Sequence, residues 1–349
     1  MNIDFNSEIN SQLDIVRKLK TSTGVFTASA QTVSTGYDKA WLRDIFFIVL
    51  GFMEAGDMET VRTTGRALLD VFIKHKDKIN WAIENKPSET WQFVHARFHP
   101  ETFEEFWEEW GNKQHDAVGE ILNLISELEL RGQTIIKVDE DKEMVQKIVD
   151  YLVAIEYWHD ADNGIWEESE EVHASSIGSV VAALKKAQQV SWIQVPEGAI
   201  QKGEQALRAL LPRESVTKFA DLSLLSLIYP FNVTTEEETI SILRNVEYHL
   251  TKDKGVLRYK GDRYYNNNQD GYSEEAEWCF GLAWLSIIYA LREDRGRAEF
   301  YLERTRSALT AEALLPELYY SHTGKPNENT PLGWAVSMYV CALVKVRDM

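Results

Sequence analysis

The sequence predicts an all-α protein, built as an (α/α)6 barrel of six helical hairpins. Apolar residues recur at helical spacing through most of the 349 residues, and strand-like alternation is nearly absent. Clusters of polar and aromatic residues fall at the starts of alternate helices. In such a barrel the inner helices run parallel to one another, so clusters at their N-terminal ends would all meet at one mouth.

The helical periodicity predicts twelve helices. No linker, low-complexity tract or sequence repeat divides the chain, so residues 1–349 are interpreted as a single domain. A solenoid of helical hairpins is the alternative, but its helix pairs would show a period in the sequence, and none is visible. The expected helices cover residues 7–20, 41–55, 58–76, 115–131, 141–158, 173–190, 197–211, 219–228, 236–250, 275–293, 294–310 and 331–347.

The clusters open or precede the even-numbered helices of this series. Two of these helices are also rich in small residues, which would let inner helices approach closely around a narrow axis; ordinary helix packing explains them equally well. The small residues are Ala174, Ser175, Ser176, Gly178, Ser179, Ala182 and Ala183 in the sixth helix and Gly281, Ala283 and Ser286 in the tenth. The clusters lie at residues 37–44, 110–116, 166–168, 212–213 with 221, 258–262 and 315–317.

Composition narrows the class of ligand. The formal net charge of −18 argues against binding to nucleic acid or to an anionic membrane surface, and fits a neutral ligand. No secretory signal and no apolar stretch of bilayer-spanning length is visible. Cys279 and Cys341 lie in apolar helical patterns, which predicts buried thiols in a reducing compartment. We therefore expect a cytoplasmic protein; its oligomeric state is left unpredicted.

Metal and phosphate chemistry are disfavoured by the sequence. His95 and His99 stand four residues apart, but Pro100 and Arg97 disfavour a helical metal pair, and no Cys or further His completes a ligand set. The chain has no nucleophile elbow, P-loop or GxGxxG motif. We expect neither a metal nor a cofactor.

The central stretch runs from residue 163 to 178. The Asn163-Gly164 turn leads to Trp166 and then to the adjacent carboxylates Glu167 and Glu168. An aromatic ring beside a desolvated carboxyl group suits sugar chemistry, because the ring stacks on a sugar face and the acid protonates a leaving oxygen. The alternative interpretation is an acidic loop that caps a helix, with Trp166 in the core.

Residues 77–114 form the longest stretch between expected helices. They are rich in tryptophan and phenylalanine, and long loops in compact domains are usually functional, so this stretch is a candidate wall of a pocket. Its glutamates at 101, 104, 105, 108 and 109 are better explained as the solvated face of a short helix.

The kind of chemistry that the sequence still favours is acid–base catalysis by carboxyl groups. Glu167 and Glu317 are distant in sequence, but both precede even-numbered helices, so the barrel would bring them to one mouth. Charged pairs, Arg43 with Asp44 and Arg258 with Asp262, would grip sugar hydroxyls. The expected stacking surfaces are Tyr37, Trp41, Trp110 and Trp166.

These motifs resemble glycoside hydrolase family 15, the glucoamylase family, over nearly the full length. Trp41-Leu-Arg43-Asp44 resembles Trp-x-Arg-Asp, with Tyr37 at a subsite position. Residues 110–116 are similar to Trp-Gly-x-x-Gln-x-Asp, which implies substrate-binding roles for Trp110, Gln114 and Asp116. Trp166-Glu167-Glu168 resembles the general-acid motif, and Arg258, Asp262 and Tyr264 fall in an Arg-Tyr-x-x-Asp-x-Tyr-Tyr-Asn segment. Leu315-Pro316-Glu317 lies where the family has its general base, but Leu318-Tyr319 follows, as in the related domain of phosphorylase kinase α and β subunits.

The resemblance implies an inverting, exo-acting α-glucoside hydrolase that releases β-glucose from α-glucans or maltooligosaccharides. Glu167 would be the general acid and Glu317 the general base, with carboxyl groups roughly 6.5–9.5 Å apart to admit a water. We expect a raised pKa for Glu167 and an unraised one for Glu317. Two alternatives stay open: a non-hydrolytic carbohydrate-sensing domain like that of phosphorylase kinase, or a glycosidase of the same fold acting on trehalose or isomaltosides.

Overall fold

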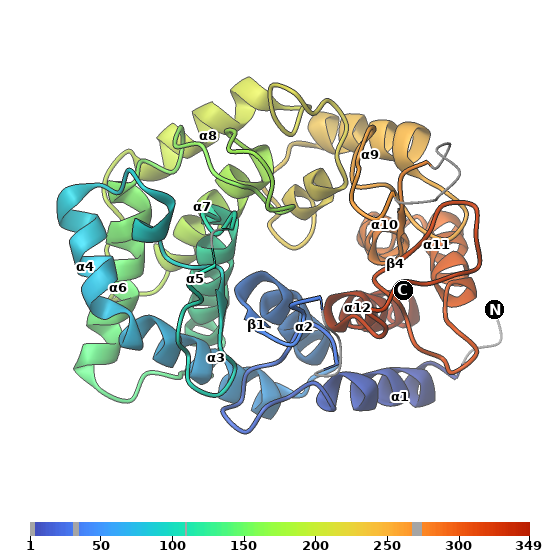
Figure 1. Cartoon of the computed structure of the whole chain (residues 1–349), viewed down its shortest axis with the longest axis horizontal. Helices are drawn as coiled ribbons and strands as arrows, with labels where there is room; N and C mark the ends of the chain where they lie inside the picture. The colour runs from blue at the N-terminus through green and yellow to red at the C-terminus, as the bar shows by residue number, and fades with distance from the viewer. Residues whose placement is uncertain (1–3, 31–34, 109, 267–273) are drawn as a thin grey trace.

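The chain folds as a ring of helices inside a second layer of helices. The computed structural model describes residues 4–30, 35–108, 110–266 and 274–349. Each inner element contacts the next, and the last inner helix contacts the first, so the ring is closed (Figure 1). This arrangement confirms the predicted fold class. The inner elements are α2 (Leu42–Glu54), α5 (His115–Leu130), α7 (Ala174–Ala187), the 3-10 helix η2 (Leu222–Leu227), α10 (Phe280–Leu291) and α12 (Gly333–Arg347).

Burial separates the inner helices from the outer ones. Every residue of α10 from Phe280 to Ala290 is buried, whereas α11 buries only one stripe, Ala298, Tyr301, Leu302 and Thr305. An inner helix has neighbours on all sides, so it is apolar all round, and an outer helix needs only one apolar face. The outer helices are α1 (Phe5–Arg17), α3 (Met58–Lys74), α6 (Asp139–Ala154), α8 (Ala199–Leu210), α9 (Glu236–Leu250) and α11 (Arg295–Ser307).

Small residues set the spacing of the inner ring. A methyl group added to Gly119 on α5 would lie 2.8 Å from Ser179 Oγ on α7. One added to Gly51 on α2 would lie 2.9 Å from Ser337 Cβ on α12. Both distances are too short for a real contact, so the two helix pairs approach as closely as they do because these positions lack a side chain.

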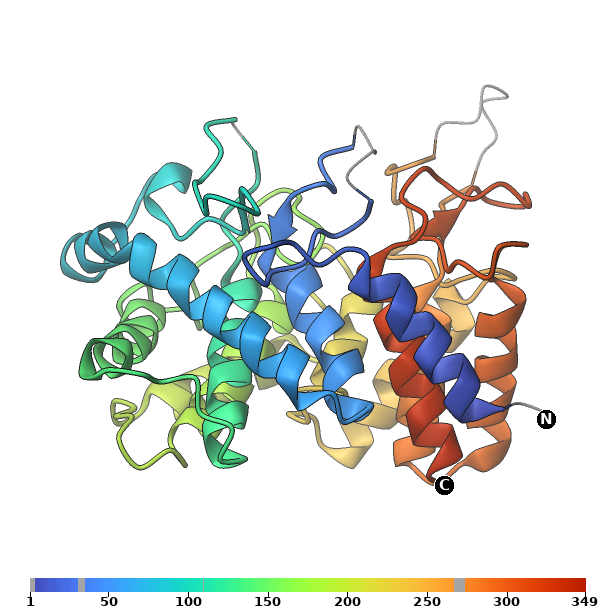
Figure 2. The same cartoon turned by 90° about the horizontal axis from the view of Figure 1, so that it is seen from below.

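Two short antiparallel ladders lie at the mouth of the ring. β1 (Ala40–Trp41) pairs with β2 (Arg97–Phe98), and β3 (Glu277–Trp278) pairs with β4 (Leu318–Tyr319). Figure 2 shows that β1 and the loops that precede inner helices gather on one side of the molecule. Two-residue strands are too short to leave an alternating pattern, which explains why the sequence did not predict them.

Three expectations about secondary structure were wrong. The predicted helix 219–228 is the short 3-10 helix η2, capped by the Asp221 carboxylate that accepts from Ser223 N. The stretch 77–114 holds helix α4 (Lys76–Asn85), which packs on α6, and the 3-10 turn η1 (Thr90–Gln92). Residues 101–108 are not helical, and Glu109 lies outside the described residues. Three of the glutamates form ion pairs instead: Glu104 with Lys74, Glu105 with Lys78, and Glu108 with Arg97.

Two further expectations concern cysteines and membrane spans. Cys279 and Cys341 are both free and buried, as predicted. Within the described part of the chain, no helix is both long and apolar enough to cross a bilayer.

Candidate active site

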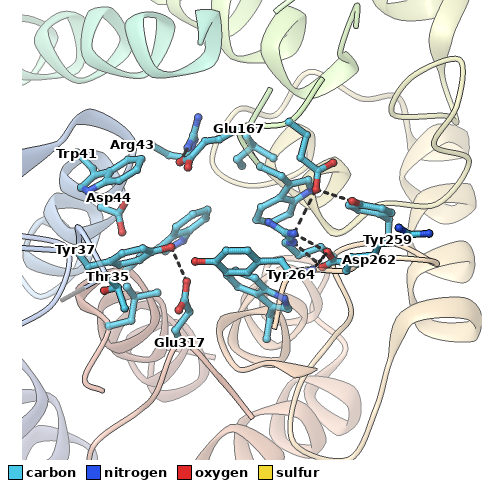
Figure 3. A pocket seen from close by; sticks show the side chains of 18 of the residues that line it. Thr35, Tyr37, Trp41, Arg43, Asp44, Glu167, Tyr259, Asp262, Tyr264 and Glu317 are labelled. Carbon is cyan, nitrogen blue, oxygen red and sulfur yellow. Dashed lines mark hydrogen bonds and ion pairs between the residues drawn. The ribbon is translucent and has the colours of Figure 1, made fainter. Parts of the chain in front are cut away.

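A pocket of about 650 Å³ opens at the mouth of the ring. It is lined by residues from the loops and strands that precede α2, α7, α10 and α12 and from the loop that follows Arg258. Figure 3 shows Glu167 and Glu317 on opposite sides of this pocket, although 150 residues separate them in sequence. Eleven of the thirteen predicted site residues line it: Tyr37, Trp41, Arg43, Asp44, Trp110, Trp166, Glu167, Glu168, Arg258, Asp262 and Glu317.

Glu167 lies on the turn that follows Asn163-Gly164. Its backbone has φ +63°, a left-handed conformation that costs a non-glycine residue about 1 kcal/mol or more. The side chain keeps 23% of its accessible surface, and Oε1 accepts a 3.3 Å contact from Arg43 Nη1. Burial raises the pKa of Glu167 to about 8; the Asp44 charge adds to the effect, and Arg43 and Arg258 oppose it. Glu167 therefore carries its proton at neutral pH.

Glu317 is fully buried and lies at the other side of the pocket. Oε1 accepts from Tyr37 Oη at 2.7 Å, and Oε2 accepts from Asn329 Nδ2 at 2.7 Å and from Asn327 Nδ2. Burial raises the pKa of Glu317, and the three donors oppose that rise because they favour the charged carboxylate. The expectation of an unraised pKa for Glu317 was wrong. The sequence places Glu317 in a loop before a helix, but the folded protein encloses its side chain completely.

Arg43 connects the pocket to the helix behind it. Its Nε donates to Asp116 Oδ2 at 2.6 Å, and its Nη2 donates to Gln114 Oε1 at 2.5 Å and to Gly164 O at 3.3 Å. Gln114 and Asp116 do not line the pocket. Both residues instead hold the guanidinium group of Arg43, which lines the pocket, and their substrate-binding role stays a prediction.

Arg258 lies at the centre of a second cluster of charged side chains. Asp262 accepts from both Nε and Nη2 of Arg258, at 2.7 and 2.6 Å. Glu168 accepts from Lys218 Nζ at 2.6 Å and from Tyr259 Oη at 2.5 Å, and lies 3.3 Å from Arg258 Nη2. Burial alone would raise the pKa of Glu168, but the bonds from Lys218 and Tyr259 outweigh it and lower the pKa. The two adjacent glutamates thus differ at neutral pH: Glu167 is protonated and Glu168 is ionised.

Aromatic rings form the apolar part of the lining. Trp166 Nε1 donates to Asp221 Oδ1 at 2.8 Å, which fixes the plane of the indole. Its ring lies nearly parallel to Trp334, with an interplanar angle of 15° and centroids 6.5 Å apart, and Trp334 stacks on Phe280 at 4.4 Å. These rigid faces suit the apolar face of a sugar ring.

Asp44 is a pocket carboxyl group that the protein leaves available. No hydrogen bond to its side chain is found among the described residues, whereas its neighbour Arg43 donates to Asp116 and Gln114. Burial raises the pKa of Asp44 to about 7; Arg43 opposes the rise and Glu317 adds to it. Such a group can accept a hydrogen bond from a ligand hydroxyl.

The profile of the family Glycosyl hydrolases family 15 matches residues 9–276, more than half of the chain. The chain belongs to glycosyl hydrolase family 15.

The proteins to which this chain is similar include a regulatory subunit, a glycosidase and a glucoamylase. A probable phosphorylase b kinase regulatory subunit alpha of Caenorhabditis elegans is 27% identical over 66% of this chain, and the match spans only 23% of that relative's length. A solved wild-type glycosidase superposes with a TM-score of 0.83 at 19% identity, covering 98% of this chain and 97% of the other. A bacterial glucoamylase complexed with acarbose gives a TM-score of 0.73 at 15% identity, covering 99% of this chain and 56% of that chain. The structural likenesses show a shared fold.

Several residues of this family 15 site were not predicted as site residues. Asn327 and Asn329 bind Glu317, Lys218 binds Glu168, and Arg97 and Trp278 line the pocket. The only usable signal was the spacing of the two asparagines, two residues apart in the loop before α12, so that both amides reach one carboxylate.

The two histidines considered for a metal point to different partners. His95 Nδ1 accepts from Arg97 N, and burial lowers the pKa of His95 to about 3. His99 Nδ1 accepts from the backbone of Glu101 and Thr102. In the residues that the structure describes, no group of three or more His, Cys, Asp or Glu side chains is placed to hold a metal ion.

Gly164 is expected to be essential to the position of Glu167 in this family 15 site. It has φ +61°, and a Cβ there would lie 2.8 Å from the ring of buried His173, so Gly164→Ala must shift the turn. We expect the kcat of a reaction that uses Glu167 to fall by up to about a hundredfold, because a displacement of about 1 Å costs a positioned group that much. Gly132→Ala is the matched control: Gly132 has φ +67° with nothing within 4 Å, so it shares the backbone strain of about 1–2 kcal/mol without the clash. Equal kcat in the two variants would contradict the positioning role.

Proposed function

We propose that this chain is an inverting, exo-acting α-glucoside hydrolase that releases β-glucose from the non-reducing ends of α-glucans or maltooligosaccharides. The observation that carries the proposal is the contrast between two carboxyl groups of one pocket. Glu167 has a pKa raised to about 8 and one long contact to a cation, whereas Glu317 accepts hydrogen bonds from three donors. One group is poised to give a proton and the other to take one.

The mechanism follows from this difference. Glu167 protonates the glycosidic oxygen as the bond to the anomeric carbon breaks. Glu317, as the carboxylate, removes a proton from a water that attacks the anomeric carbon from the opposite face, which inverts its configuration. Tyr37, Asn327 and Asn329 fix the orientation of the Glu317 carboxylate in the pocket wall.

The remaining lining residues suit a neutral sugar. Arg43 and Arg258 present N–H groups whose charge is already balanced by Asp116 and Asp262, and the Asp44 side chain is available to a hydroxyl. Trp334 and Leu332, at the start of α12, add apolar surface to the lining. A pocket of about 650 Å³ at the mouth of the ring suits the terminal unit of a glucan chain, which supports exo-cleavage. Related structures are solved with glucose and with acarbose, which supports a carbohydrate ligand.

The direct test is to incubate the protein with maltose, isomaltose and trehalose and to follow the products by ¹H NMR. We expect maltose to be cleaved fastest, with the β-anomer of glucose appearing first and the α-anomer later by mutarotation. Initial release of the α-anomer would overturn inversion. Preferential cleavage of trehalose or isomaltose would replace the proposed linkage with another one on the same fold.

The second candidate is a carbohydrate-binding domain without turnover. The likeness to regulatory subunits of phosphorylase b kinase favours it, because those relatives are described as regulatory. The same incubation separates the two: binding of maltooligosaccharide with no glucose released from any substrate supports the regulatory alternative.

A further inference from the structure

We propose that a groove beside the active pocket binds the distal sugar units of an α-glucan whose non-reducing end occupies that pocket. We call it the tryptophan groove; it lies between α4, η1 and residues 105–108 and 110–112 and has a volume of about 1040 Å³. The inference rests on the proposed function, because it proposes that the hydrolase acts on glucans longer than the pocket alone can hold.

Exposed tryptophans are concentrated in the groove. Trp81, Trp91 and Trp107 are 39, 69 and 100% exposed, and all three line it. They are the only tryptophans among the large exposed hydrophobic residues in the part of the chain that the structure describes. Large rigid rings left in water on one face of a monomer mark a binding surface, because their burial against a ligand is favourable.

The groove and the active pocket share a wall. Trp110 lines both cavities. Arg97, which lines the active pocket, lies over the ring of Trp110 at 4.5 Å and over that of Phe106 at 5.4 Å, and it pairs with Glu108 at 2.6 Å. Phe106 and Glu108 line the groove. Trp110 is therefore the point at which a glucan chain that leaves the pocket would reach the groove.

The charges of the groove favour an uncharged ligand. Lys78, its one lysine, is held by Glu105 at 2.8 Å, and the pKa of His95 is lowered to about 3 by burial, so that its ring is neutral. Glu89, Glu105 and Glu108 give the lining a negative balance, and the whole chain carries −18. An anionic ligand would be repelled. A neutral oligosaccharide fits both the exposed indoles and the carboxylates of the groove. Its ring faces stack on indoles, and its hydroxyl groups donate to carboxylates.

The test uses Trp91→Ala combined with Trp107→Ala, two exposed positions whose change leaves the core intact. Affinity for maltoheptaose is measured by calorimetry in a Glu167→Gln background, so that no substrate is consumed. We expect the Kd to rise by about tenfold, the scale of losing stacking on two rings. In the active protein the ratio of kcat/KM for maltoheptaose to that for maltose is expected to fall by a similar factor. Tyr248→Ala, at a residue 83% exposed outside both cavities, is the matched control.

The outcomes separate the groove from the hydrolase proposal. If the protein cleaves maltooligosaccharides but the tryptophan variant keeps the wild-type Kd and ratio, the groove proposal is overturned and the hydrolase stands. If no sugar is cleaved yet maltoheptaose binding weakens in the variant, the hydrolase fails and the groove stands. Sedimentation that shows a wild-type dimer and a monomeric variant, with unchanged maltoheptaose affinity, would make the face a protein interface and overturn the proposal.

Discussion

Replacing Glu167 by glutamine is expected to lower kcat on maltooligosaccharides by about 10²–10⁴-fold, the contribution of a positioned general acid. Glutamine keeps the size of the side chain and its contact with Arg43 but has no acidic proton. In the wild type the active form needs Glu167 protonated, so kcat/KM is expected to fall as the pH rises through about 8. The pH profile of the variant should lack that alkaline limb.

The control for this prediction is the adjacent residue. Glu168→Gln removes an ionised carboxylate held by Lys218 and Tyr259, so we expect a higher KM with the alkaline limb retained. Stability gives a second check. Because the pKa of Glu167 is raised in the folded state, its contribution to stability is complete below the usual value near 4.5 and is lost as the pH rises through about 8. Glu167→Gln should therefore be at least as stable as the wild type at pH 8. Wild-type kcat in Glu167→Gln would remove Glu167 from its role.

Replacing Arg43 by methionine is expected to cost about 3–5 kcal/mol in the free energy of unfolding, because it leaves the buried Asp116 carboxylate without its partner. Both side chains of this pair are only 2% exposed, and their contact is 2.6 Å. The loss is measured by denaturant titration monitored by circular dichroism. Activity should also disappear, since Arg43 contacts both Glu167 and Gly164.

The matched control is Arg17→Met. Arg17 pairs with Asp14 and Asp57 at the surface, so its loss is expected to cost at most about 1 kcal/mol. The double variant Arg43→Met with Asp116→Asn should regain much of the lost stability, because it no longer buries an uncompensated charge, and should stay inactive. Equal destabilisation by Arg43→Met and Arg17→Met would contradict the buried-pair account.

Long, strongly periodic segments could be predicted from sequence. The inner helices α10 and α12 are apolar all round, and clusters before alternate helices located the mouth of the barrel. The eighth helix of the predicted series, which is the fourth element of the inner ring, was assigned wrongly, because the apolar run at residues 222–227 has the pattern of an α-helix yet folds as a 3-10 helix capped by Asp221. Helix α4 was missed because tryptophans and charges around it obscure a short periodic stretch.

Site residues could be predicted where a motif lies next to the start of a helix. The direction of a side chain and the depth of its burial could not. Gln114 and Asp116 belong to a recognisable motif, but their side chains turn toward Arg43, and the sequence does not give that direction. The enclosure of Glu317 depends on residues 327–329 folding back over it. Arg97 lies in the two-residue strand β2 and Lys218 in a loop. Neither stretch is periodic, so only the folded chain shows what these residues contact.

Closure of the ring has a consequence for how the molecule is assembled. Helical proteins usually fold quickly because their contacts are local in sequence. Here Glu8 on α1 is hydrogen-bonded to Tyr339 on α12, 331 positions away, and Tyr37 donates to Glu317 across 280 positions. The entropic cost of joining such remote segments grows only slowly with their separation. It therefore lowers the rate of folding more than it lowers the stability of the folded state. The pocket that Tyr37 and Glu317 line can therefore exist only after segments 280 positions apart have met, which makes it a late feature of folding.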